Sequence, residues 1–577
     1  MLGNTKREKQ QATFGLLLFM IIFPAWTIGQ EPDGERPAVL SAETLFAPDK
    51  VVNVEIEVQD EDWDLLRKQG RSMTLALGKE LPEKPFTYVP ANITVNGQRI
   101  EQVGIRKKGF LGSLSEDRPS LKIKFSEFRK QSPIEGLSRL TLNNNKQDPS
   151  RLNQYLSYRL FNEAGVIAPR CNFAKVTVNG KYLGIYSNVE SVKKPFLARF
   201  GDDDGALYEG TVVDFFEDRL RRFESKNTNA DYKDLQKVAR ILSEKPIDLD
   251  QLEGMVDLEA FLKFWAIESL IGFWDGYTNN QNNFFIYRNP VNKKFNFIPW
   301  GLDSSFTYQM PIPPFKISHQ TVHSQAILAN ELYKIPAIQT RYHKTFQNIL
   351  NEHWDETALL RQVEQAENLI ENDIMEGHEG FAEDVKRVQD FIRSRRTALS
   401  REIEAWPVKI TTPPRRPFYF EKVGEAQADF STNWFEKTPR TDPPVGTTDM
   451  MLTMNGELVV LTEVSVYVEP DKNRPEVNGK RPPSLVFTGK RKRDGKPILI
   501  GVGLDDQDFR PSKEGEVRVE GIYIEGNPLF FFAAMAMGRA QFVLTSGKVR
   551  FRKAARAVGG EVEGTIQLDI LRTSEPN

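Results

Sequence analysis

Alternation of apolar and polar residues dominates the first third of the chain and predicts β-strands. Two Asn-Gly pairs, at 96–97 and 179–180, each lie between two such stretches and are typical of tight hairpin turns. The predicted strands are Val51–Val58, Tyr88–Val95, Gln98–Arg106, Ser120–Phe125, Phe173–Val178 and Tyr182–Val189. A short helix is predicted at Asp62–Gln69. The first third is therefore expected to be a β-rich lobe.

Helical periodicity prevails farther along the chain. Residues 148–163 begin with Asp148-Pro149, a capping residue followed by a proline, and are followed by Gly165. The segment 213–245 has a charged helical pattern, and Asp257 is expected to cap an apolar helix that runs to Ile271. Further along we expect a hairpin of 284–287 with 295–299, and helices over 324–405 that stop at Trp406-Pro407.

The pattern changes again after a Pro-rich stretch, TTPPRRP at 411–417, which is typical of a linker. Short alternating runs then replace helical periodicity: Glu457–Val468, Ser484–Thr488, Pro497–Val502, Glu516–Ile524, Gln541–Leu544 and Gly564–Leu571. We assign 409–417 as a linker and 418–577 as an all-β, sandwich-like accessory domain.

The N-terminus has the pattern of a secretory signal. Basic residues Lys6, Arg7 and Lys9 precede an apolar run from Phe14 to Ile28, which is short for a membrane span. We predict a signal peptide at 1–29, with an uncleaved N-terminal anchor as the alternative, and a polar linker at 30–48. In both cases the rest of the protein is expected to be secreted or extracytoplasmic, in the periplasm or at the cell surface.

Composition excludes several classes of function. The net charge of −2 over 577 residues gives no global attraction to nucleic acid, so no nucleic-acid partner is predicted. The single cysteine, Cys171, forms no internal disulfide and no zinc cluster, and the five histidines lack HExxH spacing. Lys107-Lys108 and Asp202-Asp203-Asp204 are both interpreted as surface turns.

Candidate chemistry is concentrated in residues 272–306. Asp275, Asn283 and Asp303 occur there in the order that phosphoryl transfer needs: a carboxylate for the attacking hydroxyl, then an amide and a second carboxylate for Mg²⁺. The pattern alone favours loop capping, because Asn and Asp side chains commonly bond their own backbone in turns. Asn280 and Asn282 compete with Asn283 for the metal-binding role.

An ordered set of motifs resembles the spore coat protein H (CotH) kinase family from about residue 50 to 400. The motifs are VGIRKKG at 103–109, PSLKIKF at 119–125, DPSRLNQYLSYRLFNEAGVIAPR at 148–170, VTVNGKYLGIYSNVE at 176–190, GALYEG at 205–210, WDGYTNNQNNFFIY at 274–287 and FIPWGLDSSF at 297–306. The resemblance implies an α+β, atypical protein-kinase-like two-lobed domain at 49–408. The family includes secreted or spore-surface proteins, and some members phosphorylate proteins with ATP and metal.

The resemblance also implies roles for individual residues. Asp275 would be the catalytic carboxylate, and Asn283 and Asp303 would bind Mg²⁺ or Mn²⁺. The ATP-binding residues would be Lys122, with Lys124 as the alternative, Arg106 as a second phosphate contact, and Glu190, which would pair with that lysine or hold metal. No GxGxxG loop is present, and the basic turn RKKGFLGS would cover the phosphates instead.

One motif departs from the family, whose pattern usually reads Pro-Trp-Asp-x-Asp, because Gly301 stands at the first acidic position. Two hypotheses of different classes follow. The first is a secreted protein kinase that transfers the γ-phosphoryl group of ATP to Ser or Thr of extracellular or surface proteins, with no stable membrane span unless the signal is uncleaved. The alternative is a catalytically inactive scaffold for surface or matrix assembly. An enzyme of the same fold that transfers AMP is a third possibility.

Overall fold

The structure is a computed structural model that describes residues 40–574, apart from residues 80, 82–83, 309–316, 318, 376–379, 473, 475, 477–479, 507, 512–514 and 528–542. The predicted signal peptide 1–29 lies outside the described residues, as do residues 30–39 of the predicted linker. The described helices include none with the length and apolar character needed to cross a membrane.

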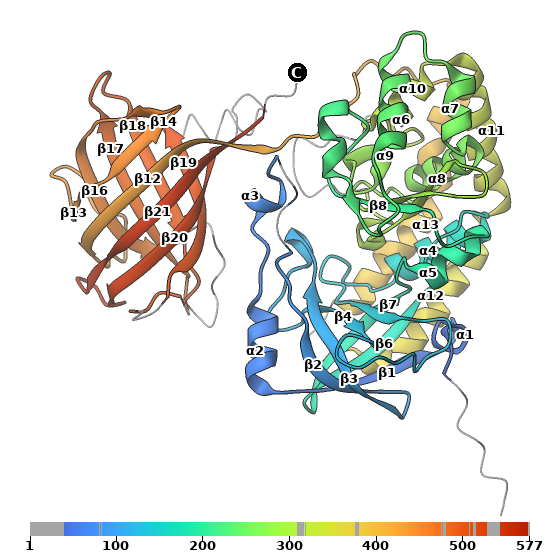
Figure 1. Cartoon of the computed structure of the whole chain (residues 1–577), viewed down its shortest axis with the longest axis horizontal. Helices are drawn as coiled ribbons and strands as arrows, with labels where there is room; N and C mark the ends of the chain where they lie inside the picture. The colour runs from blue at the N-terminus through green and yellow to red at the C-terminus, as the bar shows by residue number, and fades with distance from the viewer. Residues whose placement is uncertain are drawn as a thin grey trace, which may run out of the picture.

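The first part of the chain forms a closed β-barrel, at the bottom of Figure 1. Its strand order is β1-β2-β3-β4-β5-β7-β6, closed by parallel pairing of β1 with β6. The strands are β1 (Val51–Val58), β2 (Val89–Val95), β3 (Gln98–Lys108), β4 (Ser120–Lys124), β5 (Arg139–Asn143), β6 (Cys171–Val178) and β7 (Lys181–Val189). Their inward apolar side chains form a core of their own. The alternation in the sequence predicted these strands apart from β5, for which no strand was predicted.

Short helices precede, interrupt and follow the barrel strands in the sequence. They are α1 (Ala42–Leu45), α2 (Asp60–Lys68), α3 (Met73–Ala76), α4 (Asn153–Glu163) and α5 (Lys194–Leu197). Leu45 is fully buried in the barrel core, so residues 40–48 are folded onto the domain and are no linker. Helix α4 begins five residues after Asp148, whose carboxylate still accepts a hydrogen bond from Asn153 N (2.8 Å) and so caps the helix across a turn.

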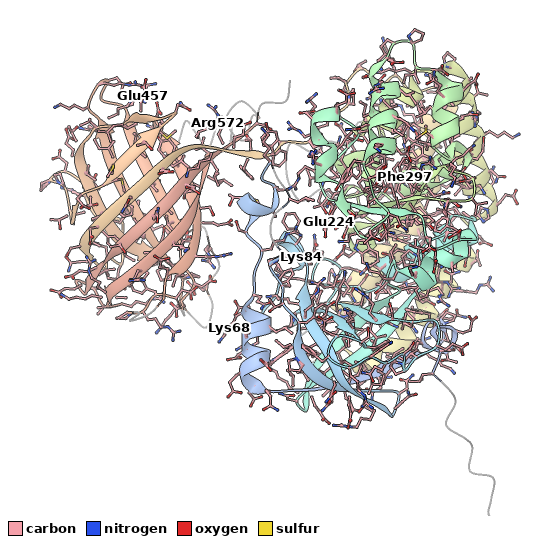
Figure 2. The ribbon with its side chains drawn as sticks, viewed as in Figure 1. Lys68, Lys84, Glu224, Phe297, Glu457 and Arg572 are labelled. Atoms are coloured by element: carbon pink, nitrogen blue, oxygen red, sulfur yellow. The ribbon has the colours of Figure 1, made fainter. Side chains whose placement is uncertain are left out.

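A second, larger core lies in the helical part at the upper right of Figure 1. A small sheet of order β11-β10-β8-β9 packs there with the helices. These elements are β8 (Ala206–Gly210), β9 (Glu224–Ser225), α6 (Lys233–Ser243), α7 (Leu249–Met255), α8 (Leu258–Leu270), α9 (Tyr277–Asn280), β10 (Phe284–Arg288), β11 (Phe295–Pro299), α10 (Ile327–Tyr333), α11 (Pro336–Glu352), α12 (Glu356–Ile370) and α13 (Phe381–Glu404). Phe297, labelled in Figure 2, packs against Phe261 of α8 with ring centroids 4.8 Å apart.

The helical prediction for 213–245 was only partly right. Residues 233–243 form α6, but Glu224–Ser225 form strand β9, which pairs with β8. Tyr232 has a left-handed backbone (φ 62°), and α6 begins directly after it. The Tyr208 hydroxyl accepts hydrogen bonds from the backbone N–H groups of Asp231 and Tyr232 at 3.1 and 3.3 Å. These tertiary contacts override the helical charge pattern.

The C-terminal domain is one curved sheet of order β15-β14-β12-β21-β20-β19-β18-β17-β16, with β13 beside β12. Its strands are β12 (Phe420–Asn433), β13 (Thr447–Thr448), β14 (Met451–Met454), β15 (Glu457–Leu458), β16 (Leu461–Pro470), β17 (Pro483–Arg491), β18 (Pro497–Gly503), β19 (Val517–Glu525), β20 (Val543–Ala554) and β21 (Glu561–Thr573). The sheet rolls up around one core (Figure 1). Trp434 bridges to Val468 of β16, the last strand in the order. Over the described residues of this domain the all-β prediction is confirmed, but these residues form one rolled sheet and not two stacked sheets.

The C-terminal domain contacts the first domain near α3. Phe420, the first residue of β12, donates its N–H to Leu77 O (2.8 Å), just after α3. Glu520 of β19 accepts a hydrogen bond from the Thr74 hydroxyl (3.1 Å). Figure 2 shows Arg572 of β21 near this junction. The C-terminal domain is thus hydrogen-bonded to the segment around α3, and it is covalently joined to the first domain through residues 409–417.

Candidate active site

The loop that follows α8 carries Asp275 and orients its carboxylate with three amides. Asn280 and Asn282 donate to Oδ1 at 2.5 and 3.1 Å, and Asn283 donates to Oδ2 at 2.8 Å. Burial raises the pKa of Asp275, and the three amide hydrogen bonds oppose that rise because they stabilise the charged form. The carboxylate is half-buried and held in one orientation.

Glu268, a fully buried residue of α8, holds this loop in place through hydrogen bonds. Glu268 accepts hydrogen bonds from the backbone N–H groups of Tyr277 and Thr278 (3.0 and 2.8 Å) and from the Thr278 hydroxyl (2.6 Å). Burial raises the pKa of Glu268 to about 7, although these hydrogen bonds act to lower it. A Cβ on Gly276 would lie 2.4 Å from Glu268 Oε1, so only glycine allows the loop to approach this closely.

Asn283 and Gly301 approach each other from β10 and from the turn after β11. Asn283 O accepts the Trp300 N–H at 3.1 Å, and a Cβ on Gly301 would stand 2.8 Å from Asn283 Oδ1. Gly301 also has a left-handed backbone (φ 58°). Because Asn283 Nδ2 faces Asp275, its Oδ1 is the atom directed to the space beside Gly301. A side chain at position 301 would need this same space.

Asp303 follows in a short 3₁₀ turn, Leu302–Ser304, and is buried. Its backbone oxygen accepts a hydrogen bond from Asn153 Nδ2 of α4 (2.8 Å), which fixes the turn. Burial raises the pKa of Asp303 to about 7, and the negative charge of Asp275 adds to the rise. The structure therefore brings the sequence-predicted Asp275, Asn283 and Asp303 into one site.

Three cations of the barrel share one face of the β3–β4 hairpin. Arg106 lies opposite Lys122 in the register, and Lys108 lies opposite Ser120. Burial lowers the pKa of Lys108 to about 8, and Asp303 is the acid that most strongly opposes this change. Lys108 therefore links the barrel electrostatically to the acidic site. The sequence interpretation of Lys107-Lys108 as an exposed turn was wrong, because Lys107 is buried and Lys108 is half-buried at the end of β3.

Glu209 of β8 is the acid that acts most strongly on Lys122, whose pKa is lowered by burial. Lys226 Nζ lies 2.5 Å from Glu209 Oε2 and 2.9 Å from Glu224 Oε1. Burial acts to raise the pKa of Glu209, but the charges of Lys226 and Lys122 outweigh it and bring that pKa to about 2. Figure 2 shows Glu224 near the level where the barrel and the helical part meet.

Glu190 was expected to pair with Lys122 or to hold metal, and the structure gives it other partners. Its carboxylate lies 2.7 Å from Arg170 Nη2 and 3.3 Å from Arg199 Nη1, and it also accepts the Arg170 backbone N–H. Only 2% of the side chain is exposed. Glu190 thus fastens the end of β7 to neighbouring segments, and Glu209 is the acid that acts most strongly on Lys122.

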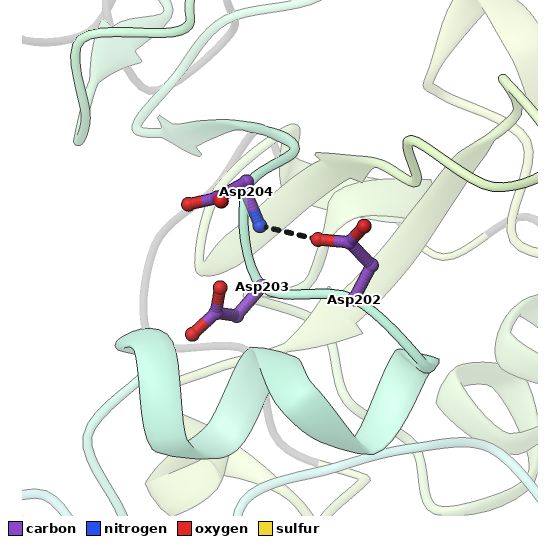
Figure 3. Close-up of side chains that lie close together, drawn as sticks. All are labelled: Asp202, Asp203 and Asp204. Atoms are coloured by element: carbon purple, nitrogen blue, oxygen red, sulfur yellow. Dashed lines mark hydrogen bonds between the residues drawn. The ribbon is translucent and has the colours of Figure 1, made fainter. Parts of the chain in front are cut away.

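Asp202, Asp203 and Asp204 form an acidic turn with oxygens close together (Figure 3). Asp204 N donates to Asp202 Oδ1 (2.9 Å), and Lys194 Nζ lies 2.6 Å from Asp204 Oδ1. The turn is satisfied by its own backbone and by a lysine. It agrees with the sequence interpretation as a surface turn.

The sequence reasoning missed two residues of this site, Lys108 and Glu209. Glu209 is in the GALYEG motif, where its apolar neighbours indicate a buried strand. An acid in a buried strand is unusual, and this could have identified Glu209 as a candidate site residue. Lys108 shares a two-residue period with Arg106, so a longer β3 would have put both on one face.

The acidic residues fit a hard divalent cation. Asn283 Oδ1 faces the space beside Gly301, and Asp303 follows two residues later and is affected electrostatically by Asp275. Carboxylate and amide oxygens of this kind suit Mg²⁺ or Mn²⁺. Burial raises the pKa of both Asp275 and Asp303, and the charge of Asp275 adds to the rise at Asp303; a bound cation would favour the charged form of both carboxylates. Asn280 is less suited than Asn283, because its Oδ1 accepts a hydrogen bond from Arg415 Nη2 (2.9 Å).

Comparison with known proteins gives a consistent picture for the first domain. The family model described as "CotH kinase protein" matches residues 105–399. The "Inner spore coat protein H" of Bacillus subtilis (strain 168) is 27% identical over 233 residues, 38% of this chain and 62% of that protein. "Invasin CotH2" of Rhizopus delemar is 22% identical over 257 residues, 40% of this chain and 43% of that protein. The chain thus spans less than two thirds of the length of these relatives.

Among solved structures, the "Helicobacter pylori proinflammatory kinase CtkA" is 13% identical, with 52% of this chain and 95% of that chain covered. Its TM-score is 0.26, which is too low to support an argument about the fold.

Proposed function

The chain belongs to the CotH kinase protein family, and we propose that it is an ATP- and metal-dependent protein kinase acting on Ser or Thr hydroxyls of extracytoplasmic proteins. The observation that supports this most directly is the hydrogen bond from Asn283 to Asp275, together with the electrostatic influence of Asp275 and of the β3–β4 cation Lys108 on Asp303. The barrel and the helical part, each with its own core, would then be the two lobes of a kinase-like domain.

Asp275 would act as the base for the attacking hydroxyl. As the Ser or Thr oxygen bonds to the γ-phosphorus, the bond from that phosphorus to the β,γ-bridging oxygen breaks and ADP leaves. The hydroxyl proton passes to Asp275 Oδ1 or Oδ2. The three amides hold the carboxylate in the orientation that this transfer requires, before the substrate arrives.

Asn283 and Asp303 would hold the metal, which when bound would neutralise charge on the transferred phosphoryl group. Arg106, Lys108 and Lys122 supply positive charge on the barrel side for the remaining phosphate oxygens. Gly301 leaves room beside Asn283 Oδ1, so the missing first acid of the family motif does not remove the predicted ligands.

An extracytoplasmic substrate is supported by the predicted signal sequence and by relatives named as a spore coat protein and as an invasin. A protein at a coat, matrix or cell surface is the acceptor class that this combination favours.

The direct test uses ATP labelled at the γ or the α position, with Mn²⁺ or Mg²⁺ and a generic acceptor protein. We expect γ label on the acceptor, no α label, and loss of transfer when EDTA removes the metal. Transfer of the α label instead would identify a nucleotidyl transferase. Absence of both labels, together with no metal-dependent ATP binding, would favour the inactive scaffold.

Metal binding should depend on pH through Asp303. Its pKa of about 7 means that a proton competes with the metal below neutrality, so affinity falls as pH decreases and levels off above about pH 8. We expect Mn²⁺ affinity to fall about fivefold between pH 7 and pH 6, by electron paramagnetic resonance titration. Asp148, which has a pKa of about 6 nearby, provides the control: Asp148→Asn should leave most of this slope in place. Equal affinity at pH 6 and pH 8 would contradict the assignment of Asp303.

A further inference from the structure

The linker between the two domains inserts an arginine into the candidate catalytic loop. Arg415 Nη2 donates to Asn280 O and Asn280 Oδ1 (2.7 and 2.9 Å), and its Nε donates to Gln281 Oε1 (3.1 Å). Gln281 Nε2 donates in return to Arg415 O (2.5 Å). The guanidinium and the backbone of one linker residue therefore contact two successive residues of the loop.

The same amide that Arg415 holds also reaches the catalytic carboxylate. Asn280 uses its oxygen for the guanidinium and its Nδ2 for Asp275 Oδ1, at 2.5 Å. With the oxygen occupied by a donor, the amide cannot flip without losing both bonds. Arg415 is thereby coupled to Asp275 through a single intervening side chain.

The linker is itself fixed to the helical part on both sides of Arg415. Arg415 N donates to Gln325 O (2.8 Å), and Thr412 O accepts from the side chain of Asn330 (3.1 Å). Arg416 forms an ion pair with Asp218 at 2.6 Å. The segment thus lies along the helical part as an ordered strap.

We propose that Arg415 is a positioning residue for the reaction, through which the interdomain linker fixes the orientation of Asp275. This inference rests on the proposed function for its effect on rate. The residues matched by the family model end at 399, so the strap lies outside the part of the chain that the family match covers. The linker is therefore part of the catalytic arrangement as well as the tether of the C-terminal domain.

A first measurement does not depend on activity. Hydrogen exchange of the full chain, followed by mass spectrometry, reports on the loop amides that bond Gly276 O and Tyr277 O, those of Asn280 and Gln281. In Arg415→Ala we expect exchange of a peptide covering 277–283 to accelerate about tenfold. Arg416→Ala is the matched control, because it removes the neighbouring linker cation that contacts Asp218. Equal exchange in Arg415→Ala and the unchanged protein would overturn the proposal.

The rate measurement separates positioning from general stability. We expect Arg415→Ala to lower kcat about 10- to 100-fold while KM for ATP changes less than about threefold. Arg415→Lys keeps a charge but loses the two-pronged contact, so it should recover only part of the rate, and it covers the case in which the alanine variant fails to fold. Full activity in both variants would overturn the proposal even if phosphoryl transfer is established. If no variant, nor the unchanged chain, transfers phosphate, the proposed function fails and the exchange result alone decides the role of Arg415 in ordering the loop.

Discussion

Asp275→Asn should reduce phosphoryl transfer at least about 1000-fold, because it removes the base and leaves an isosteric side chain in its place. The amide cannot accept the hydroxyl proton. Its NH₂ group would also face one of the amides that now donate to the carboxylate, so one hydrogen bond would be lost. ATP binding should change less than about threefold, since the cations of the β3–β4 hairpin remain.

The measurement is single-turnover transfer of γ label, with ATP affinity determined separately by equilibrium binding. Asp203→Asn is the matched control, because it makes the same chemical change in the surface turn of Figure 3 and should retain full activity. A rate for Asp275→Asn above about one tenth of the unchanged protein would be too high for loss of a general base and would remove Asp275 from that role.

Much of the fold follows from short-range patterns. Both Asn-Gly hairpins, the strands of the barrel apart from β5, and the helix capped by Asp257 occur where the sequence places them. These elements are determined locally, by turn chemistry and by which face is apolar. The closure of the barrel by β1 and β6, and the single rolled sheet of the C-terminal domain, depend on pairing between distant segments. The sequence pattern of one strand carries no information on its partner.

The site was predictable where residues are close in sequence and unpredictable where they are not. Asp275 and Asn283 are eight positions apart, and their contact follows from one loop. The electrostatic influence of Glu209 on Lys122, by contrast, acts between the second sheet and the barrel. Glu190 was assigned to that lysine by resemblance, and its arginine partners could be identified only from the folded chain.

The linker shows a different limit of sequence reasoning. Its composition, rich in proline and charge, is typical of an exposed connector. Burial lowers the pKa of Arg415 to about 10, and Asp214 and Asp275 act to keep it charged. The interactions of Arg415 therefore involve residues that only folding brings close to it. Composition therefore identified the linker between the domains, but it did not predict the contact of Arg415 with the loop that carries Asp275.

Glu268→Ala should lower the free energy of unfolding of the first domain by about 3 kcal/mol, because it leaves two buried backbone N–H groups without their acceptor. These belong to Tyr277 and Thr278, at the start of α9. Loss of the unfavourable burial of the carboxylate offsets part of the cost, which is why the expected figure is below the sum of three hydrogen bonds. Glu268→Gln keeps one acceptor and should cost about 2 kcal/mol.

Urea unfolding followed by tryptophan fluorescence measures the change, with Glu383→Ala of α13, an exposed carboxylate, as the control expected to shift stability by less than about 0.5 kcal/mol. Gly276→Ala should disturb the same hydrogen bonds in another way, since the added Cβ would lie 2.4 Å from Glu268 Oε1 and displace the carboxylate. We expect both Glu268→Ala and Gly276→Ala to disorder the loop and so to abolish transfer, although neither residue contacts the reacting groups. If Glu268→Ala unfolded at the same urea concentration as the unchanged protein, the loop would be held by other contacts, and the orientation of Asp275 would have to be attributed to the amides and Arg415 alone.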